Sequence, residues 1–74
     1  MFLHIGSGRC VPVKDIAMIV DCEAFGGEER PLNGKQYVDA GGRRSAVVTA
    51  DTVYYTPIAT GALRKRLQAL IKVT

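Results

Sequence analysis

Residues 45–56 read SAVVTADTVYYT, two runs of strand-forming residues that meet at Asp51. Val, Thr and Tyr favour extended backbone because their branched or aromatic side chains pack well on a pleated surface. Asp is typical of tight turns, so residues 45–50 and 52–56 are predicted to pair as a hairpin. Tyr54 and Tyr55 alternate in direction, so one is expected in the core while the other can contact a partner. The sequence does not say which.

Further strands are predicted on the N-terminal side of this hairpin. Residues 1–5 and 9–13 flank a Gly-Ser-Gly turn and predict a second hairpin. Pro12 has no N–H donor and therefore restricts its strand to an edge position or a strand end. Residues 16–22 are almost continuously apolar and predict a central strand, and residues 36–39 predict a short one.

The C-terminal segment predicts an amphipathic helix over residues 61–72, with Thr60 as its N-cap. Apolar side chains recur at helical spacing and form a stripe to pack on the sheet: Leu63, Leu67, Leu70 and Ile71. Polar side chains are expected to face water or a partner: Arg64, Lys65, Gln68 and Lys72. The predicted fold class is α+β, a small, mainly antiparallel β-sheet domain with a C-terminal amphipathic helix, in a single domain spanning residues 1–74.

Composition limits both the core and the class of protein. The chain has 74 residues, of which 47% are hydrophobic but only 7% aromatic, so its core is thin and self-association is expected. Its apolar runs are too short for a membrane span, and its N-terminus lacks the pattern of a signal peptide, so a cytoplasmic protein is predicted. Cys10 and Cys22 have no zinc-site spacing and are expected to be reduced, partly buried thiols. No metal and no cofactor are predicted.

An enzyme is the least favoured class. Gly6-Ser7-Gly8 follows a strand, but Val11 stands where a dinucleotide-binding loop needs its third glycine, and the following residues cannot open a helix. His4 has no nucleophile or carboxylate pair arranged around it. A chain this short also has little material with which to enclose a substrate pocket, and no small-molecule ligand is evident.

The charge of the chain is mild in total but uneven. The formal net charge is +3, and after Gly34 only Asp39 and Asp51 are acidic. Five of the ten basic residues lie in two short segments: Arg43 and Arg44 after two glycines, and Arg64, Lys65 and Arg66 on the predicted helix. Such clustering indicates a cationic surface in the C-terminal half.

The segment Gly41-Gly42-Arg43-Arg44 suits a phosphate. Glycines permit positive φ and let backbone N–H groups converge on an anion, and arginine forks match phosphate oxygens. The same residues would equally serve a solvated turn or a pair with a carboxylate of a neighbouring subunit. The predicted nucleic-acid-binding residues are Gly42, Arg43, Arg44, Arg64 and Lys65, with Arg9 as a weaker addition.

An ordered set of short segments resembles the RemA family of small bacterial regulators. The set comprises Ile5-Gly6-Ser7-Gly8, residues 16–20, Val38-Asp39-Ala40, Gly42-Arg43-Arg44, Ala46-Val47-Val48 and Val53. The ending, Tyr54-Tyr55-Thr56-Pro57 followed by Leu63-Arg64-Lys65-Arg66, looks more like the RemB branch, named for regulation of the extracellular matrix of biofilms. One segment departs from the family: residues 23–36 are short, acidic and rich in Gly and Pro, and predict a loop where RemA-type members have a longer, helix-like segment.

The resemblance implies a DNA-binding transcription regulator that forms a ring-like homo-oligomer, with the Gly-Arg-Arg position contacting double-stranded DNA. Here this position is Arg43 and Arg44. Two alternatives stay open. One is an oligomeric scaffold or protein-binding module without DNA binding, and the other is an RNA-binding protein that stacks bases on Tyr54 or Tyr55.

Overall fold

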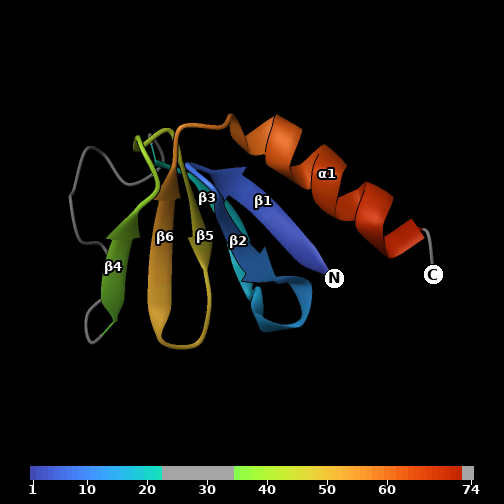
Figure 1. Cartoon of the computed structure of the whole chain (residues 1–74), viewed down its shortest axis with the longest axis horizontal. Coiled ribbons are helices and arrows are strands. Elements are labelled where there is room, and N and C mark those ends of the chain that lie inside the picture. Colours follow the sequence, from blue (N-terminus) through green and yellow to red (C-terminus); the bar gives the residue numbers. More distant parts are fainter. Residues whose placement is uncertain (23–34, 73–74) are drawn as a thin grey trace.

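The computed structural model describes residues 1–22 and 35–72 of the chain. Within these residues it contains six strands, a short 3-10 helix and one α-helix (Figure 1). In chain order they are β1 (Phe2–Gly6), β2 (Arg9–Pro12), η1 (Val13–Asp15), β3 (Met18–Asp21), β4 (Gln36–Asp39), β5 (Ser45–Val48), β6 (Thr52–Thr56) and α1 (Thr60–Lys72). The predicted α+β class, with mainly antiparallel strands and a C-terminal helix, is confirmed.

The β5–β6 hairpin is the centre of the fold. Its strands pair antiparallel, with Val47 opposite Tyr54, and every residue of β5 is buried. The predicted strand 45–50 ends at Val48 because Thr49 begins the turn, its N–H donating to the Thr52 carbonyl at 2.8 Å. Lys35 fixes the same turn through its ammonium group, which donates to two turn carbonyls. Those carbonyls therefore have a charged donor in place of water.

The hairpin lies inside a four-stranded sheet with the order β3-β5-β6-β4, in which β4 runs parallel to β6. The prediction that residues 16–22 form a central strand was wrong, because β3 is the edge of this sheet and, among the described strands, pairs with β5 alone. Most residues of β3 are nevertheless apolar because side chains on both faces of the strand pack against hydrophobic clusters. Ile19 belongs to one hydrophobic cluster, and Val20 packs against the other.

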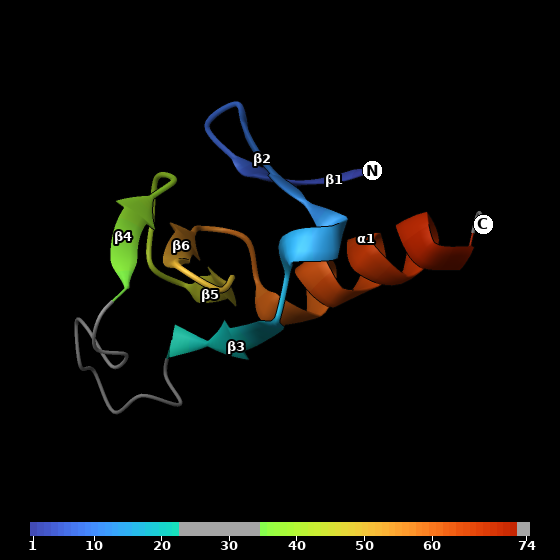
Figure 2. The same ribbon diagram turned by 90° about the horizontal axis from the view of Figure 1, so that it is seen from below.

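The predicted β1–β2 hairpin is confirmed, and Pro12 stands at the end of its strand, opposite Phe2. Figure 2 shows this hairpin and α1 on the same face of the four-stranded sheet. Two side-chain bonds attach the hairpin to the sheet: the Thr56 hydroxyl donates to the Ile5 carbonyl at 2.6 Å, and the Ser7 hydroxyl donates to the Ala40 carbonyl at 2.8 Å.

Two clusters of buried apolar side chains make the core. The first fills the space between the hairpin, the sheet and α1, and consists of Leu3, Ile5, Val11, Ile19, Ala40, Val47 and Leu63. The second lies on the other face of the sheet and consists of Ala46, Val48, Val53 and Tyr55. Alternate residues of β5 thus enter different clusters, as the two-residue period of a strand requires.

Helix α1 begins one residue earlier than predicted. The carbonyl of Ala59 accepts the N–H of Leu63, so Ala59 and not Thr60 precedes the first turn. The Thr60 hydroxyl instead donates to the buried Ser45 hydroxyl at 2.7 Å, because that hydroxyl gives its own proton to the Ile58 carbonyl.

The apolar stripe of α1 is shorter than predicted. Leu63 is fully buried, and Leu67 and Leu70 pack against the first cluster, but Ile71 is 52% exposed. Within residues 1–22 and 35–72, no helix combines the length and apolar character needed to cross a bilayer.

Candidate nucleic-acid interface

The glycine-arginine segment forms a tight turn between β4 and β5. Asp39 ends β4, and one of its carboxylate oxygens, Oδ1, accepts the N–H groups of both Gly41 and Gly42 at 2.9 Å. Gly41 has a φ of 111°, which only glycine adopts without strain. A side chain at Gly42 would meet Pro57, since an added Cβ would lie 2.9 Å from that ring's Cβ. Both glycines are therefore required by the backbone conformation of the turn and by its close packing on Pro57.

The expected arrangement of converging N–H groups is present, but a side chain of the protein already occupies it. The two glycine N–H groups do converge on one anion, as the sequence predicts, but that anion is the carboxylate of Asp39. Because the N–H of Gly42 is already bonded to Asp39, the arginine side chains are the groups of this turn best placed to contact a phosphate, and a contact through Gly42 stays a prediction. The sequence does contain a signal for this bond. An Asp followed by Gly two and three residues later is typical of a carboxylate that accepts the N–H groups of its own turn.

Arg43 lies along the turn and against the sheet. Its Nε is 3.6 Å from Oδ2 of Asp39, and both side chains are about half exposed, at 50% and 49%. Its guanidinium also lies 5.1 Å from the ring centroid of Tyr55, which is only 4% exposed. Tyr55 in turn stacks on Tyr37, with 5.8 Å between their centroids. Arg43 is thus held between a carboxylate and an aromatic pair.

Arg44 is held by its backbone. Its N–H donates to the Thr56 carbonyl at 3.0 Å, and its carbonyl accepts the N–H of Cys22 at 3.2 Å. Its side chain is exposed, and no group in residues 1–22 and 35–72 forms a hydrogen bond or ion pair with its guanidinium. The geometry therefore offers a fork of donors to solvent from a fixed point of the sheet.

The pKa of Asp39 is lowered chiefly by the hydrogen bond from the Gly41 N–H, with partial desolvation opposing and the Gly42 N–H and Arg43 adding to the lowering. A lowered pKa in the folded state means that the ionised carboxylate stabilises the fold above the unfolded value of about 3.9, and that this contribution is lost as pH falls through the folded value. We expect the carboxyl carbon of Asp39 to titrate below pH ~3.9 by NMR. A midpoint at or above that value would contradict the turn geometry.

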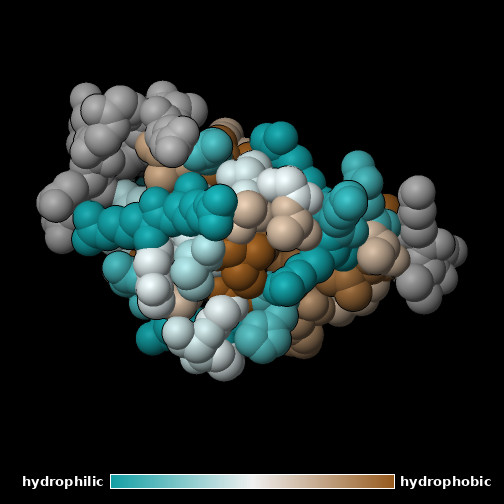
Figure 3. Space-filling model, turned by 90° about the horizontal axis from the view of Figure 1, so that it is seen from above, coloured by the Kyte–Doolittle hydropathy of each residue, from teal (hydrophilic) through white to brown (hydrophobic). Residues whose placement is uncertain are grey.

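Other loops meet this turn at the same end of the molecule. The Ser7 hydroxyl bonds to the Ala40 carbonyl, and the backbone of Gly6 packs close to Ala40 and Pro57. Arg9 is exposed and begins β2 directly after this glycine turn. Figure 3 views the end from above, where hydrophilic side chains spread over the surface around a hydrophobic area.

The helix cations are divided between structural and exposed positions. Arg64 is exposed, but its Nη2 donates to the Ile19 carbonyl of the edge strand β3 at 3.2 Å. Arg66 donates to the His4 carbonyl of β1 at 3.3 Å. These bonds tie α1 to two strands, so Arg64 has a structural role that its sequence position does not reveal. Lys65, between them, is exposed.

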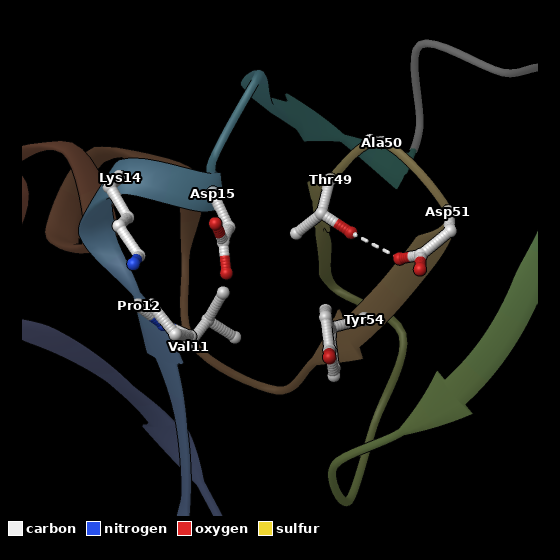
Figure 4. Close-up of a pocket in the computed structure, with 8 residues that line it drawn as sticks. All are labelled: Val11, Pro12, Lys14, Asp15, Thr49, Ala50, Asp51 and Tyr54. Atoms are coloured by element: carbon white, nitrogen blue, oxygen red, sulfur yellow. Dashed lines mark hydrogen bonds between the residues drawn. The ribbon is translucent and has the colours of Figure 1, made fainter.

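A pocket of about 380 Å³ lies at the other end of β5, between the β2–η1 segment and the β5–β6 turn (Figure 4). Two carboxylates and one ammonium group line it, from Asp15, Asp51 and Lys14, so its charge does not favour a phosphate. Asp51 accepts the hydroxyl of Thr52 at 3.0 Å and serves the turn itself. None of the predicted nucleic-acid-binding residues lines this pocket.

Both cysteines are free, as predicted, but Cys10 is exposed and only Cys22 is half-buried. The prediction of partial burial was wrong for Cys10 because its position in β2 faces away from the core, between Arg9 and the buried Val11. Burial raises the pKa of the Cys22 thiol, with Asp21 adding to the rise and Arg43 opposing it.

Comparison with known proteins identifies the relatives of this chain. No protein-family model matches it. It is similar over nearly its whole length to extracellular matrix regulatory protein B of Bacillus subtilis (strain 168), with 32% identity over 79 aligned residues that cover 99% of this chain and 98% of that protein. This agrees with the ordered set of segments that the sequence shares with the RemA family. The chain belongs to the RemA/RemB family of bacterial extracellular-matrix regulatory proteins.

Proposed function

We propose that this protein is a regulator that binds double-stranded DNA through the arginines of its β4–β5 turn, repeated once in every subunit of a homo-oligomer. The observation that carries the proposal is Arg44, whose backbone is bonded to Thr56 and Cys22 while its side chain is exposed at the loop end. Arg43 lies beside it, and Arg9 follows the neighbouring glycine turn. Guanidinium groups placed in this way fit the phosphate backbone.

Oligomerisation supplies the affinity that one subunit lacks. Two arginines on a single small domain bind DNA weakly, but several copies on one scaffold raise avidity by about 10²–10⁴ through effective concentration. Large apolar side chains are available for contact between subunits, since Met1, Phe2, Met18 and Ile71 are all more than half exposed. Binding by phosphate contacts depends strongly on salt and on DNA shape rather than on base identity.

A second candidate is a scaffold whose arginines meet carboxylates of a partner protein. Arg43 favours this reading, because it already pairs with a carboxylate within its own chain. Recognition of RNA by base stacking has less support, since Tyr55 is 4% exposed and packed against Tyr37, and Tyr54 is half-buried against the first cluster.

Arg44→Ala is expected to weaken binding to duplex DNA at least tenfold, about 1.4 kcal/mol, and to reduce the salt slope by about 0.9 for each phosphate that the variant no longer neutralises. Fluorescence anisotropy of a labelled duplex between 50 and 200 mM salt measures both quantities. The Arg43→Ala/Arg44→Ala double variant should bind more weakly still, with its oligomer intact by size exclusion, because neither side chain enters the core.

The matched control is Lys14→Ala, which removes the same charge from the other end of the molecule, beside the pocket. It should change the affinity by about twofold or less, since exposed charges separated by more than about 10 Å are largely screened. Equal losses of affinity in Lys14→Ala and Arg44→Ala would mean that only net charge matters. A wild-type oligomer that does not bind duplex DNA at all would favour the scaffold.

A further inference from the structure

The carboxylate of Asp39 lies where an incoming phosphate would be expected to lie. One oxygen accepts two glycine N–H groups at 2.9 Å, and the other faces Arg43 Nε at 3.6 Å. Converging backbone N–H groups beside a guanidinium are the donors with which proteins bind phosphate. The turn thus contains an internal anion that already uses the donors needed for an external one.

We infer that Asp39 positions Arg43 and competes with DNA phosphate for it, so that the two arginines of the turn have unequal roles. Arg44 makes the first phosphate contact, since no carboxylate in the described part of the chain holds its guanidinium in this way. Arg43 contributes only to the extent that a phosphate draws it away from Asp39. This inference rests on the proposed function, because it assigns roles within the same DNA-binding surface.

The strengths of the contacts make this competition feasible. The Arg43–Asp39 pair is half exposed and its 3.6 Å separation is long for a hydrogen bond, which is typical of pairs with a small coupling energy. The two N–H bonds to Oδ1 are shorter, involve backbone close to the sheet and do not depend on Arg43. The Arg43 side chain can therefore separate from the Asp39 carboxylate while the two glycine N–H bonds to Asp39 maintain the conformation of the turn. The stacking of its guanidinium on the buried Tyr55 ring keeps the side chain near the turn.

Asp39→Asn separates the two roles of the carboxylate. The amide oxygen of Asn can still accept the two glycine N–H groups, but the negative charge that Asp39 presents to Arg43 is gone. Duplex DNA should bind about two- to fivefold more tightly, the fold-change that matches the energy of an exposed pair, and the salt slope should steepen by up to about 0.9. Asp39→Ala also removes the acceptor, so its melting temperature should fall below that of Asp39→Asn.

A double-mutant cycle shows whether the effect passes through Arg43. In an Arg43→Ala background, Asp39→Asn should change the affinity no more than Asp15→Asn does, which removes the same charge beside the distant pocket. An equal gain in both backgrounds would overturn the inference, because the effect would then be one of net charge. Unchanged or weaker binding by Asp39→Asn would also overturn it while leaving the proposed function intact, whereas failure of the wild type to bind DNA would remove both.

Discussion

Replacing Leu63 with alanine is expected to lower the free energy of unfolding by about 2–5 kcal/mol. Leu63 is fully buried in the first cluster, where α1 meets the β1–β2 hairpin and the sheet. Its removal would leave a cavity at the junction of three elements, and Ile19 and Val47 on the sheet side have little freedom to fill it because their backbones are fixed in paired strands. A domain with only about 5–15 kcal/mol of total stability would lose a large share of it.

The measurement is chemical denaturation followed by far-ultraviolet circular dichroism, at one protein concentration for all variants because self-association adds to apparent stability. Ile71→Ala is the control on the same helix, since that side chain is more than half exposed and a surface change usually costs less than about 0.5 kcal/mol. A loss of stability for Ile71→Ala as large as that for Leu63→Ala would show that the exposed end of α1 is buried in the oligomer. A small loss for Leu63→Ala would contradict the packing described above.

The elements that the sequence predicts well are those specified by neighbouring residues. Both hairpins and the helix follow from short-range patterns, namely β-branched runs around a turn and apolar residues at helical spacing. The end of the apolar stripe could not be predicted in the same way. Ile71 has the right spacing but is more than half exposed, and the spacing of residues carries no information on where the opposite surface ends.

Errors arose where contacts join residues far apart in the chain. The apolar run around Ile19 is the same whether a strand is central or is an edge strand covered on both faces, so composition alone could not distinguish the two. The bond from Arg64 to the Ile19 carbonyl spans 45 residues and has no local signal. The same applies to the bond between Thr60 and Ser45, which takes the hydroxyl that the sequence assigns to the helix cap.

The candidate site was located by the sequence but its internal arrangement was not. Glycines followed by arginines indicated an anion-binding turn, and the structure has a turn in which N–H groups converge on an anion. That anion is the carboxylate of Asp39, two residues before the first glycine, and not an external phosphate. Local side chains compete effectively for such donors because they are tethered at high effective concentration.

Thr56→Val is expected to destabilise the protein by more than about 1–3 kcal/mol, the cost of leaving one buried polar group without a partner, although valine has nearly the same shape and is more apolar. Thr56 is fully buried, and its hydroxyl both donates to the Ile5 carbonyl at 2.6 Å and accepts the Ile58 N–H at 3.1 Å. Valine would leave both backbone groups without these partners. One of them belongs to the β1–β2 hairpin and the other to the loop that leads into α1.

Thr56→Ser is the matched comparison, because serine keeps both hydrogen bonds and lacks one methyl group, at a cost of about 1 kcal/mol. The expected order of stability is therefore wild type, then Ser, then Val, whereas apolar burial alone would make the Val variant the most stable of the three. Amide hydrogen exchange tests whether the lost hydrogen bonds cause the destabilisation. The Ile58 amide should lose protection in the Val variant and keep it in the Ser variant, since only serine provides a hydroxyl that accepts the Ile58 N–H. If valine proved as stable as wild type, the apolar cluster and the Ser7–Ala40 bond would suffice to attach the hairpin to the sheet, and the loop end that carries Arg9 would need no polar anchor at Thr56.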